Sequence, residues 1–170
     1  MKHEYLKKFD SKVFEALNGE EQRLRKWINL IPSENYSYPE VLEALGSVFT
    51  DKYAEWYPGK RYYWWNEFTD TVENLAIERA KQIFRCEHVN VQPLSGSPMN
   101  QAVYFAFLQP WDTVLGMDLS HGGHLTHWAP VSHMWKIFNF VRYKTNPANG
   151  GKIDFDELMQ MVKIYKPKIV

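Results

Sequence analysis

The sequence predicts an α/β fold with a mixed, mostly parallel sheet, and the second half of the chain carries the observations that predict it. Short apolar runs at 88–91, 112–117 and 137–143 have the length and composition of buried strands. A helical pattern separates the first run from the second, and another follows the third at 154–165. Strands that alternate with helices favour parallel pairing, with the helices packed on the sheet.

The beginning of the chain is predicted to be a helical arm over residues 1–50. Apolar side chains recur at helical spacing within 4–28, and Asn18-Gly19 is expected to end a first helix before Glu20 starts a second. Such an arm cannot bury its apolar stripe alone, so we expect it to pack on a body or on a partner chain.

The remaining elements follow from local signals in the sequence. A polar loop at 31–36 precedes a short helix that Pro39 opens and that runs to Val48. Residues 51–170 are predicted as a second domain. Its expected elements before and between the strands are an aromatic loop at 53–66, a helix at 69–84, a turn at 95–97, and a helix from Pro98 to Leu108. Residues 168–170 read as the start of a strand, and we interpret the end of the chain there as a truncation.

The overall composition narrows the classes of function. Twenty basic and twenty acidic residues give zero net charge, which argues against a nucleic-acid or anionic-membrane partner. The N-terminus lacks a signal-peptide core, and the longest apolar stretch, 102–108, is too short to span a bilayer. The single cysteine, Cys86, excludes an internal disulfide. We therefore expect a soluble, cytoplasmic protein.

Ser95, Gly96 and Ser97 join a predicted strand to a helix. Backbone N–H groups at a helix N-terminus, together with two hydroxyls, can hold a phosphate group. An ordinary helix cap made by Ser97 explains the same residues, and spacing alone favours that simpler interpretation.

His121, His124 and His127 follow a predicted strand in the sequence HGGHLTH. Three histidines at this spacing suggest zinc, but the glycine pair breaks the helix that would align them, and no thiolate accompanies them. A ligand-binding loop at the carboxyl end of a strand explains the motif better. A solvated loop remains an equal alternative on the sequence alone.

A third cluster of polar side chains lies in the aromatic loop. It places a carboxylate among phenols and a cation, which can tune an acid or a base. The residues are Tyr53, Glu55, Tyr57, Arg61, Tyr62 and Tyr63. An aromatic interface with a satisfied ion pair is the commoner outcome. Ser33, which follows a proline, reads on its own as a turn residue.

Taken together, these motifs resemble serine hydroxymethyltransferase. The resemblance rests on five segments in the family's order and spacing: IPSENY, LGSVFTDKYAE-YPGKRYY, ENLAIERAK, NVQP-SGS and LGMDLSHGGHLTH. It implies a fold-type-I pyridoxal-phosphate enzyme of one-carbon metabolism, related to aspartate aminotransferase. Such an enzyme transfers a one-carbon unit between serine and tetrahydrofolate, giving glycine and methylenetetrahydrofolate. Residues 51–170 would then be the first part of its large cofactor-binding domain.

The resemblance also implies a role for individual residues. Ser95, Gly96 and Ser97 match the phosphate loop, and His124 matches the imidazole that stacks on the pyridine ring. Ser33 and Tyr63 match groups near the substrate carboxylate, and Glu55 matches the acid/base group. Tyr53 and Glu55 belong to a loop that enters the neighbouring subunit's site. Folate-contacting positions are matched by Leu119, Gly123 and Leu125. No metal is implied, and the family forms a homodimer or a dimer of dimers.

The resemblance does not extend to every group that the reaction needs. No residue here matches the family's Schiff-base lysine, so we expect the 170-residue chain alone to be inactive. Three alternatives remain: a non-catalytic remnant that acts as a dimerisation or binding module, another fold-type-I aldolase for β-hydroxy amino acids, and a zinc protein. The folate-facing loop and the tyrosine loop argue against the aldolase.

The seven tryptophans are the second departure from the family. Six of them stand where the family has glycine, and Trp27 stands where some members have it; the six are Trp56, Trp64, Trp65, Trp111, Trp128 and Trp135. An indole at such positions is expected to overpack the structure, at about 1–3 kcal/mol per site. We interpret the pattern as UGA codons that the organism reads as glycine and that were translated as tryptophan.

Overall fold

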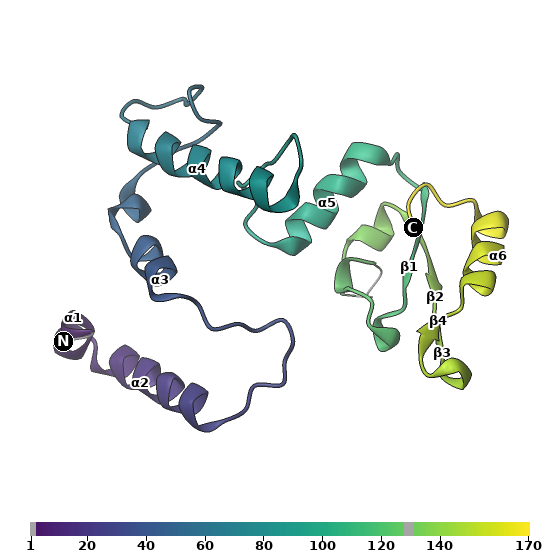
Figure 1. The fold of residues 1–170 in the computed structure, drawn as a ribbon, viewed down its shortest axis with the longest axis horizontal. Helices are drawn as coiled ribbons and strands as arrows, with labels where there is room; N and C mark the ends of the chain where they lie inside the picture. Colours follow the sequence, from purple (N-terminus) through teal and green to yellow (C-terminus); the bar gives the residue numbers. More distant parts are fainter. Residues whose placement is uncertain (1–2, 128–130) are drawn as a thin grey trace. The chain divides into compact units, whose positions relative to one another are not determined.

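The computed structural model describes residues 3–127 and 131–170 and has an α/β arrangement (Figure 1). The chain separates into two compact units, Met1–Thr71 and Val72–Val170, each of which is described by itself. The predicted domain boundary at residue 50 stays a prediction, because compactness alone does not define a domain. No helix in the described part of the chain has both the length and the apolar character needed to cross a membrane.

The first unit is helical, as predicted. It contains α1 (Glu4–Phe9), α2 (Ser11–Lys26), α3 (Pro39–Leu45), the 3-10 turn η1 (Val48–Asp51) and the start of α4 (Glu67–Phe84). Pro39 opens α3 as expected, but the helix ends at Leu45 rather than at the predicted Val48. Residues 53–66 form a loop. The helix α4 confirms the predicted helix at 69–84 and begins two residues earlier.

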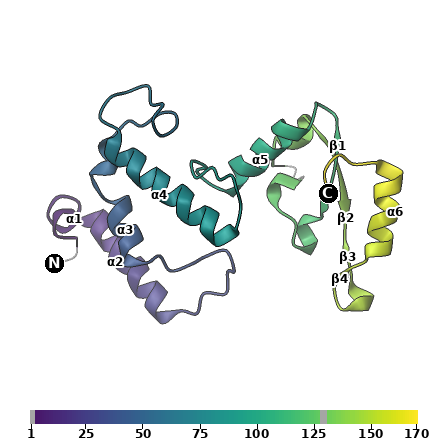
Figure 2. The ribbon, with the colours of Figure 1, turned by 45° about the horizontal axis from the view of Figure 1, so that its top comes forward.

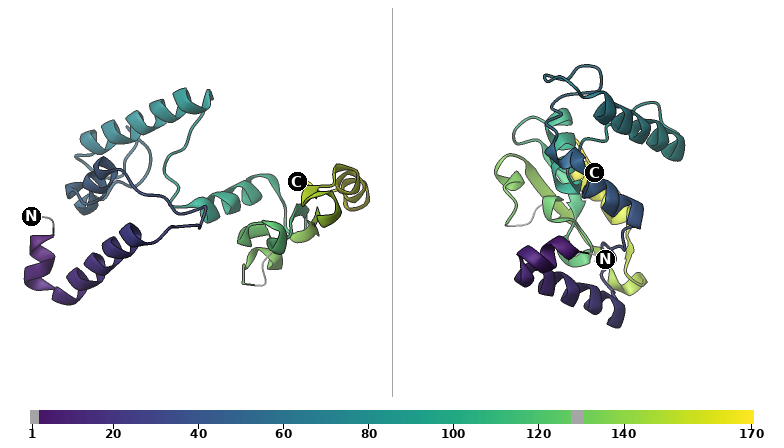
Figure 3. Two further views of the ribbon diagram at one scale, coloured as in Figure 1. Left: turned by 60° about the horizontal axis from the view of Figure 1, so that its bottom comes forward. Right: turned by 90° about the vertical axis from the view of Figure 1, so that its left-hand side faces the viewer.

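The predicted break at Asn18-Gly19 is wrong, because both residues lie inside α2. The chain instead turns at Asp10, whose carboxylate accepts a hydrogen bond from the backbone N–H of Val13 at 3.1 Å. Figure 3 shows α1 and α2 as two short helices that meet at this turn. Gly19 costs the helix only about 1 kcal/mol relative to alanine, and the sixteen-residue helix continues through it.

The first unit has almost no core of its own. Asn66 is the only buried residue among its described residues. Apolar side chains of the arm stay exposed, including Phe9 (74%) and Ile28 (87%). The expectation that this arm packs against a further body therefore agrees with its exposure, and the identity of that body stays a prediction.

The second unit carries the sheet. Its main elements are α5 (Gly96–Phe107), β1 (Thr113–Met117), β2 (Asn139–Tyr143), β3 (Thr145–Asn146), β4 (Lys152–Ile153) and α6 (Phe155–Tyr165). Short 3-10 turns connect them: η2 (Leu119–His121), η3 (Leu125–His127), η4 (Met134–Lys136) and η5 (Pro147–Asn149). Figure 2 shows β1 and β2 side by side, with α6 along them.

The pairing of the strands is mostly parallel. The strands β1 and β2 pair from Thr113↔Asn139 to Met117↔Tyr143, and Val114 forms a parallel bridge to Ile169. That bridge agrees with the strand start predicted at 168–170. A small antiparallel pair, β3 with β4, makes the whole mixed.

The predicted strand at His88–Val91 is wrong. These residues have no regular structure, and the side chain of Asn90 accepts a hydrogen bond from the backbone N–H of Gln92 at 2.9 Å. An Asn side chain that bonds the backbone two residues on closes a local turn, which competes with pairing in a sheet.

The core of the second unit lies between α5 and the sheet. It consists of Tyr104, Leu108, Val114, Met134 and Phe138. The ring of Tyr104 meets the rings of Phe138 and Phe140 edge to face, with centroids 5.9 Å and 5.6 Å apart. This packing fixes α5 against the strands whose carboxyl ends carry the histidine loop.

Three tryptophans have a backbone conformation that favours glycine. The φ angles are 81° at Trp56, 58° at Trp65 and 71° at Trp111. A bulky residue with positive φ is an outlier.

The six tryptophans in the described part of the chain all have exposed side chains, between 42% and 84%. The expected overpacking is therefore wrong at these six positions. Where one of these tryptophans lowers the stability of the fold, its backbone conformation is the cause. Trp128 lies outside the described residues.

The turn at Trp111 shows why glycine fits there. Asp112 N–H donates to Gln109 O at 3.0 Å across a four-residue turn with Pro110 second and Trp111 third. Proline in the second position followed by positive φ in the third is the pattern of a type II turn. That third position is normally glycine or asparagine.

Candidate functional site

The loop after β1 turns sharply because two glycines allow it. Gly122 has φ +105°, a conformation that side chains rarely adopt. A Cβ atom on Gly123 would lie 1.9 Å from the carbonyl oxygen of Met117. The loop therefore folds back onto the end of its own strand, and only glycine permits that approach.

Asp118 anchors the same loop. Its carboxylate accepts hydrogen bonds from Ser120 Oγ at 2.6 Å and Ser120 N–H at 2.9 Å, and it forms an ion pair with Arg142 at 3.0 Å. The Ser120 hydroxyl, followed by the Ser120 N–H and the charge of Arg142, lowers the pKa of Asp118 below its ordinary value. The carboxylate thus stays ionised and ties the loop to β2.

A cavity of about 450 Å³ opens beside this loop. The predicted residues Gly123 and His124 line it, together with Asn100, Tyr104 and His127. The ring centroids of His124 and His127 lie 5.9 Å apart. Burial, and secondarily the neighbouring His124, lowers the pKa of His127, so this ring stays neutral to lower pH than an ordinary histidine.

Sequence reasoning missed Thr126 and Asn100. Thr126 is buried, and its Oγ1 accepts a hydrogen bond from Asn100 Nδ2 at 2.8 Å and lies 2.7 Å from His124 Nδ1. The hydroxyl of Tyr104 donates to the carbonyl oxygen of Thr126 at 3.4 Å. The only signal in the sequence was the place of Thr126 inside HLTH, which gives no indication of these partners.

Ser95, Gly96 and Ser97 lie at the N-terminus of α5. The helix begins at Gly96 with Ser95 as its cap residue, so the alternative in which Ser97 is the cap is wrong. The side chain of Ser95 makes no capping hydrogen bond, and no atom lies within 4 Å of a Cβ built on Gly96. The N-terminus of this twelve-residue helix thus has no side-chain cap, which fits an anion such as a phosphate.

The two predicted folate-contacting leucines flank the histidine loop. Leu119 begins η2 and Leu125 begins η3, and their side chains are 47% and 49% exposed. Neither lines the cavity beside His124. Both apolar side chains are accessible to a ligand outside that cavity.

In the first unit, the predicted tyrosine loop brings Tyr53 and Tyr63 together. Their rings meet edge to face with centroids 4.8 Å apart. The charge of Glu55, followed by Tyr63, raises the pKa of the Tyr53 phenol. Tyr53, Glu55 and Tyr63 therefore form one electrostatic group.

Arg61 fixes the shape of this loop. Its guanidinium forms an ion pair with Asp70 at 2.8 Å and donates to the carbonyl oxygens of Ala54 and Trp56. Asp70 also accepts the backbone N–H of Gly59 at 2.9 Å. The ion pair that the sequence suggested exists, and Asp70, rather than Glu55, is the partner of Arg61.

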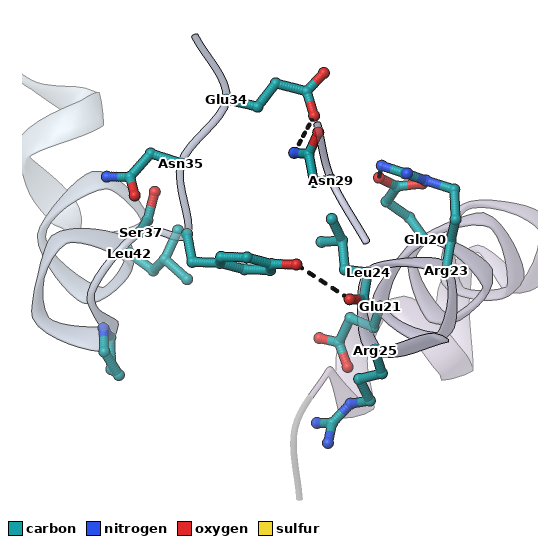
Figure 4. Close-up of a pocket in the computed structure, with 12 residues that line it drawn as sticks. Glu20, Glu21, Arg23, Leu24, Arg25, Asn29, Glu34, Asn35, Ser37 and Leu42 are labelled. Carbon is teal, nitrogen blue, oxygen red and sulfur yellow. Dashed lines mark hydrogen bonds and ion pairs between the residues drawn. The ribbon is translucent and has the colours of Figure 1, made fainter. Parts of the chain in front are cut away.

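Ser33 lies in an exposed turn of the first unit, next to Glu34, whose N–H donates to the carbonyl oxygen of Ile31 at 3.1 Å. Among the described residues, no hydrogen bond joins Ser33 to the tyrosine loop. A hollow of about 890 Å³ nearby is lined by Glu34, Asn35 and residues of α2 (Figure 4). Its polar groups pair with one another: Asn29 donates to Glu34 at 2.6 Å, and Tyr36 donates to the Leu24 carbonyl at 3.1 Å. We therefore place the candidate site at the histidine loop instead.

Within residues 3–127 and 131–170, no three His, Cys, Asp or Glu side chains gather in a way that could hold a metal ion. Nδ1 of both His121 and His124 faces a threonine. This geometry gives the zinc alternative no support.

Comparison with known proteins identifies the family. The sequence profile described as serine hydroxymethyltransferase matches residues 6–170. Proteins named serine hydroxymethyltransferase from Nitratiruptor sp. and Methylococcus capsulatus are each 53% identical to the chain, over 167 and 162 residues. These matches cover 98% and 95% of the chain but 40% and 38% of the relatives, so the chain spans about two fifths of their length. The chain belongs to the serine hydroxymethyltransferase family.

Proposed function

We propose that these residues form part of an enzyme that transfers a one-carbon unit reversibly between serine and tetrahydrofolate. The observation that carries this proposal is the pairing of an open helix N-terminus with a histidine-lined cavity in the second unit. The first suits a phosphate group, and the second, which Asn100 of the same helix also lines, offers the planar ring of His124. Family membership gives the pairing its chemical interpretation.

Pyridoxal 5'-phosphate, when bound, would supply the electron-accepting ring that this chemistry needs. Ser95, Gly96 and Ser97 would hold its phosphate group through the N–H groups of α5 and the two hydroxyls. His124 would offer its ring face to the pyridine. The fit is supported by the uncapped Ser95 side chain and by the open space at Gly96.

Residues that match the family's substrate-contacting positions would hold the substrates. Glu55 would exchange a proton with the hydroxyl of serine, and Tyr53, Tyr63 and Ser33 would orient the amino acid. Leu119, Gly123 and Leu125 would contact tetrahydrofolate. The raised pKa of Tyr53 supports this assignment, because it keeps the phenol protonated, and therefore a hydrogen-bond donor, beside the Glu55 carboxylate.

We also propose fold type I for the complete protein, a cytoplasmic location, and a homodimer or dimer of dimers. The parallel strands with α5 packed against them support the fold type. The single, exposed Cys86 is compatible with a reducing compartment. The uncovered apolar side chains of α1 and α2 support assembly.

The activity is tested with a chimera. These 170 residues, with the seven tryptophans changed to glycine, replace the matching part of the Methylococcus capsulatus relative, whose remaining length completes the protein. We expect serine to be converted to glycine in a reaction that requires tetrahydrofolate. Replacing Glu55→Gln should lower the rate about 10²–10⁴-fold, the usual contribution of an acid/base group. Replacing Glu43→Gln on the exposed face of α3 is the control, and equal loss in both variants would contradict the role of Glu55.

A further inference from the structure

Two histidines of the loop after β1 contact threonines in the same way. His124 Nδ1 lies 2.7 Å from Thr126 Oγ1 and accepts the Thr126 backbone N–H at 3.2 Å. His121 Nδ1 lies 2.8 Å from Thr145 Oγ1 and accepts the Thr145 backbone N–H at 3.2 Å. In each pair, the amide and the hydroxyl of one threonine converge on one ring nitrogen.

This arrangement determines where the proton of each neutral imidazole sits. A backbone N–H can only donate, so the nitrogen that it faces must present a lone pair. A proton on Nδ1 would set two hydrogens against each other and leave the Thr126 N–H without that acceptor. The proton therefore belongs on Nε2.

The partners of Thr126 agree with this direction of bonding. Asn100 Nδ2 donates to Thr126 Oγ1 at 2.8 Å, so the hydroxyl is free to donate its own hydrogen to His124 Nδ1. Tyr104 holds the Thr126 carbonyl, and both Asn100 and Tyr104 belong to α5. Thr126 thus links His124 to the helix whose N-terminus carries Ser95 and Ser97.

We propose that Thr126 is a positioning residue that holds His124 as the neutral Nε2–H tautomer with a fixed ring plane. The geometry assigns the same tautomer to His121 through Thr145. The benefit for catalysis rests on the proposed function. The imidazole of His124 would already be oriented when a planar ligand binds, and the Nε2–H of His124 could donate to an oxygen acceptor. The tautomer itself does not depend on that function.

The test is nitrogen NMR of the protein labelled with ¹⁵N-histidine, recorded without cofactor above the pH range in which histidine titrates. Protonated and unprotonated imidazole nitrogens resonate in separate ranges. We expect Nδ1 of His124 and of His121 in the unprotonated range and both Nε2 atoms in the protonated range. A protonated Nδ1 in His124 of the unmodified protein would overturn the proposal without the need for any variant.

Matched variants separate the two pairs. Thr126→Val removes one donor and keeps the side-chain shape, so the Nδ1 signal of His124 should move toward that of a free, unbonded nitrogen. Thr126→Ser should restore it. Thr145→Val should shift only His121, which makes it the control. If Thr126→Val leaves the His124 signals unchanged, the hydroxyl has no positioning role.

A second measurement connects the tautomer to the site. Pyridoxal phosphate is titrated into the completed chimera carrying the same substitutions at Thr126, and we expect Thr126→Val to bind it more weakly than Thr126→Ser. If the labelled protein shows the predicted NMR signals but the chimera does not bind the cofactor, the proposed function fails and the tautomer assignment stands. If the chimera binds the cofactor while Nδ1 of His124 is protonated, the positioning proposal alone fails.

Discussion

At the scale of single residues, the backbone at three tryptophans is strained by the side chain it carries. Positive φ places Cβ too close to the neighbouring carbonyl, at about 1–2 kcal/mol per residue. We therefore expect Trp56→Gly, Trp65→Gly and Trp111→Gly each to raise the free energy of unfolding by about that amount. Urea denaturation of each variant measures the effect.

Trp27→Gly is the matched control, because its indole is also exposed (71%) while its φ is −114°. Glycine there should cost about 0.5–1 kcal/mol through its greater freedom in the unfolded chain. Equal effects at Trp27 and Trp111 would show that the backbone conformation does not matter. The codons give an independent check, since UGG at these positions would end the recoding hypothesis.

Gly123 permits the loop to fold back on β1, and no other residue type fits there. Replacing Gly123→Ala would put a methyl group 1.9 Å from the backbone oxygen of Met117, which has no flexible side chain to move aside. We expect a loss of stability of at least about 1–3 kcal/mol, as for other overpacked sites.

Gly19→Ala in α2, where nothing lies within 4 Å, should instead stabilise the protein by about 1 kcal/mol. Thermal unfolding of both variants distinguishes these opposite signs.

At the scale of elements, the tyrosine loop depends on one ion pair. Asp70 joins the start of α4 to Gly59 and to Arg61, whose side chain is only 4% exposed. The Gly59 N–H and then Arg61 lower the pKa of Asp70. Between the ordinary aspartate pKa of about 3.9 and the lower folded value, only the unfolded chain binds the proton, so stability falls as the pH drops through this range.

Replacing Asp70→Asn should remove that part of the acid dependence. At neutral pH the variant should lose about 1–3 kcal/mol, because Arg61 keeps its burial and loses a charged hydrogen-bond partner. Unfolding curves measured at several pH values test both expectations. Asp51→Asn on the exposed turn η1 is the control for the removal of one carboxylate.

Local patterns predicted the elements whose signals lie within one segment. The strand at β1 and the helices α3, α4 and α6 were confirmed because apolar spacing, Pro39 and the capping residue Asp154 specify them locally. The predicted strand at 88–91 failed because its apolar run was short and Asn90 closes a turn. The predicted break at Asn18-Gly19 was wrong, because the chain breaks at Asp10, which ends α1 and caps the N-terminus of α2.

The candidate site shows the same limit. Gly123 and His124 were found because their motif is contiguous, whereas the network of Thr126 joins residues 26 positions apart. Asp70 was not singled out as the partner of Arg61, because only the folded loop brings the two together. Contacts between distant segments carry no pattern in a single sequence.

At the scale of the whole molecule, the described residues leave an assembly to be completed. The arm of α1 and α2 exposes its apolar stripe, and the two-stranded parallel pair β1–β2 has one further bridge to Ile169. The relatives are about two and a half times as long as the matched part. We infer that both surfaces are covered when the rest of such a protein is present.

The last prediction combines the missing lysine with the tryptophans. The 170-residue chain alone should not cleave serine, because no residue in it matches the family's Schiff-base lysine. A chimera that supplies this lysine should be active when all seven tryptophans are changed to glycine. The chimera that keeps them should be inactive, because strained turns at Trp56 and Trp65 would displace the tyrosine loop between them. The measurement is glycine formation from serine with and without tetrahydrofolate, with the unmodified Methylococcus capsulatus relative as the positive control. Equal activity of the two chimeras would show that the indoles are tolerated, and activity of the isolated chain would refute the need for the lysine.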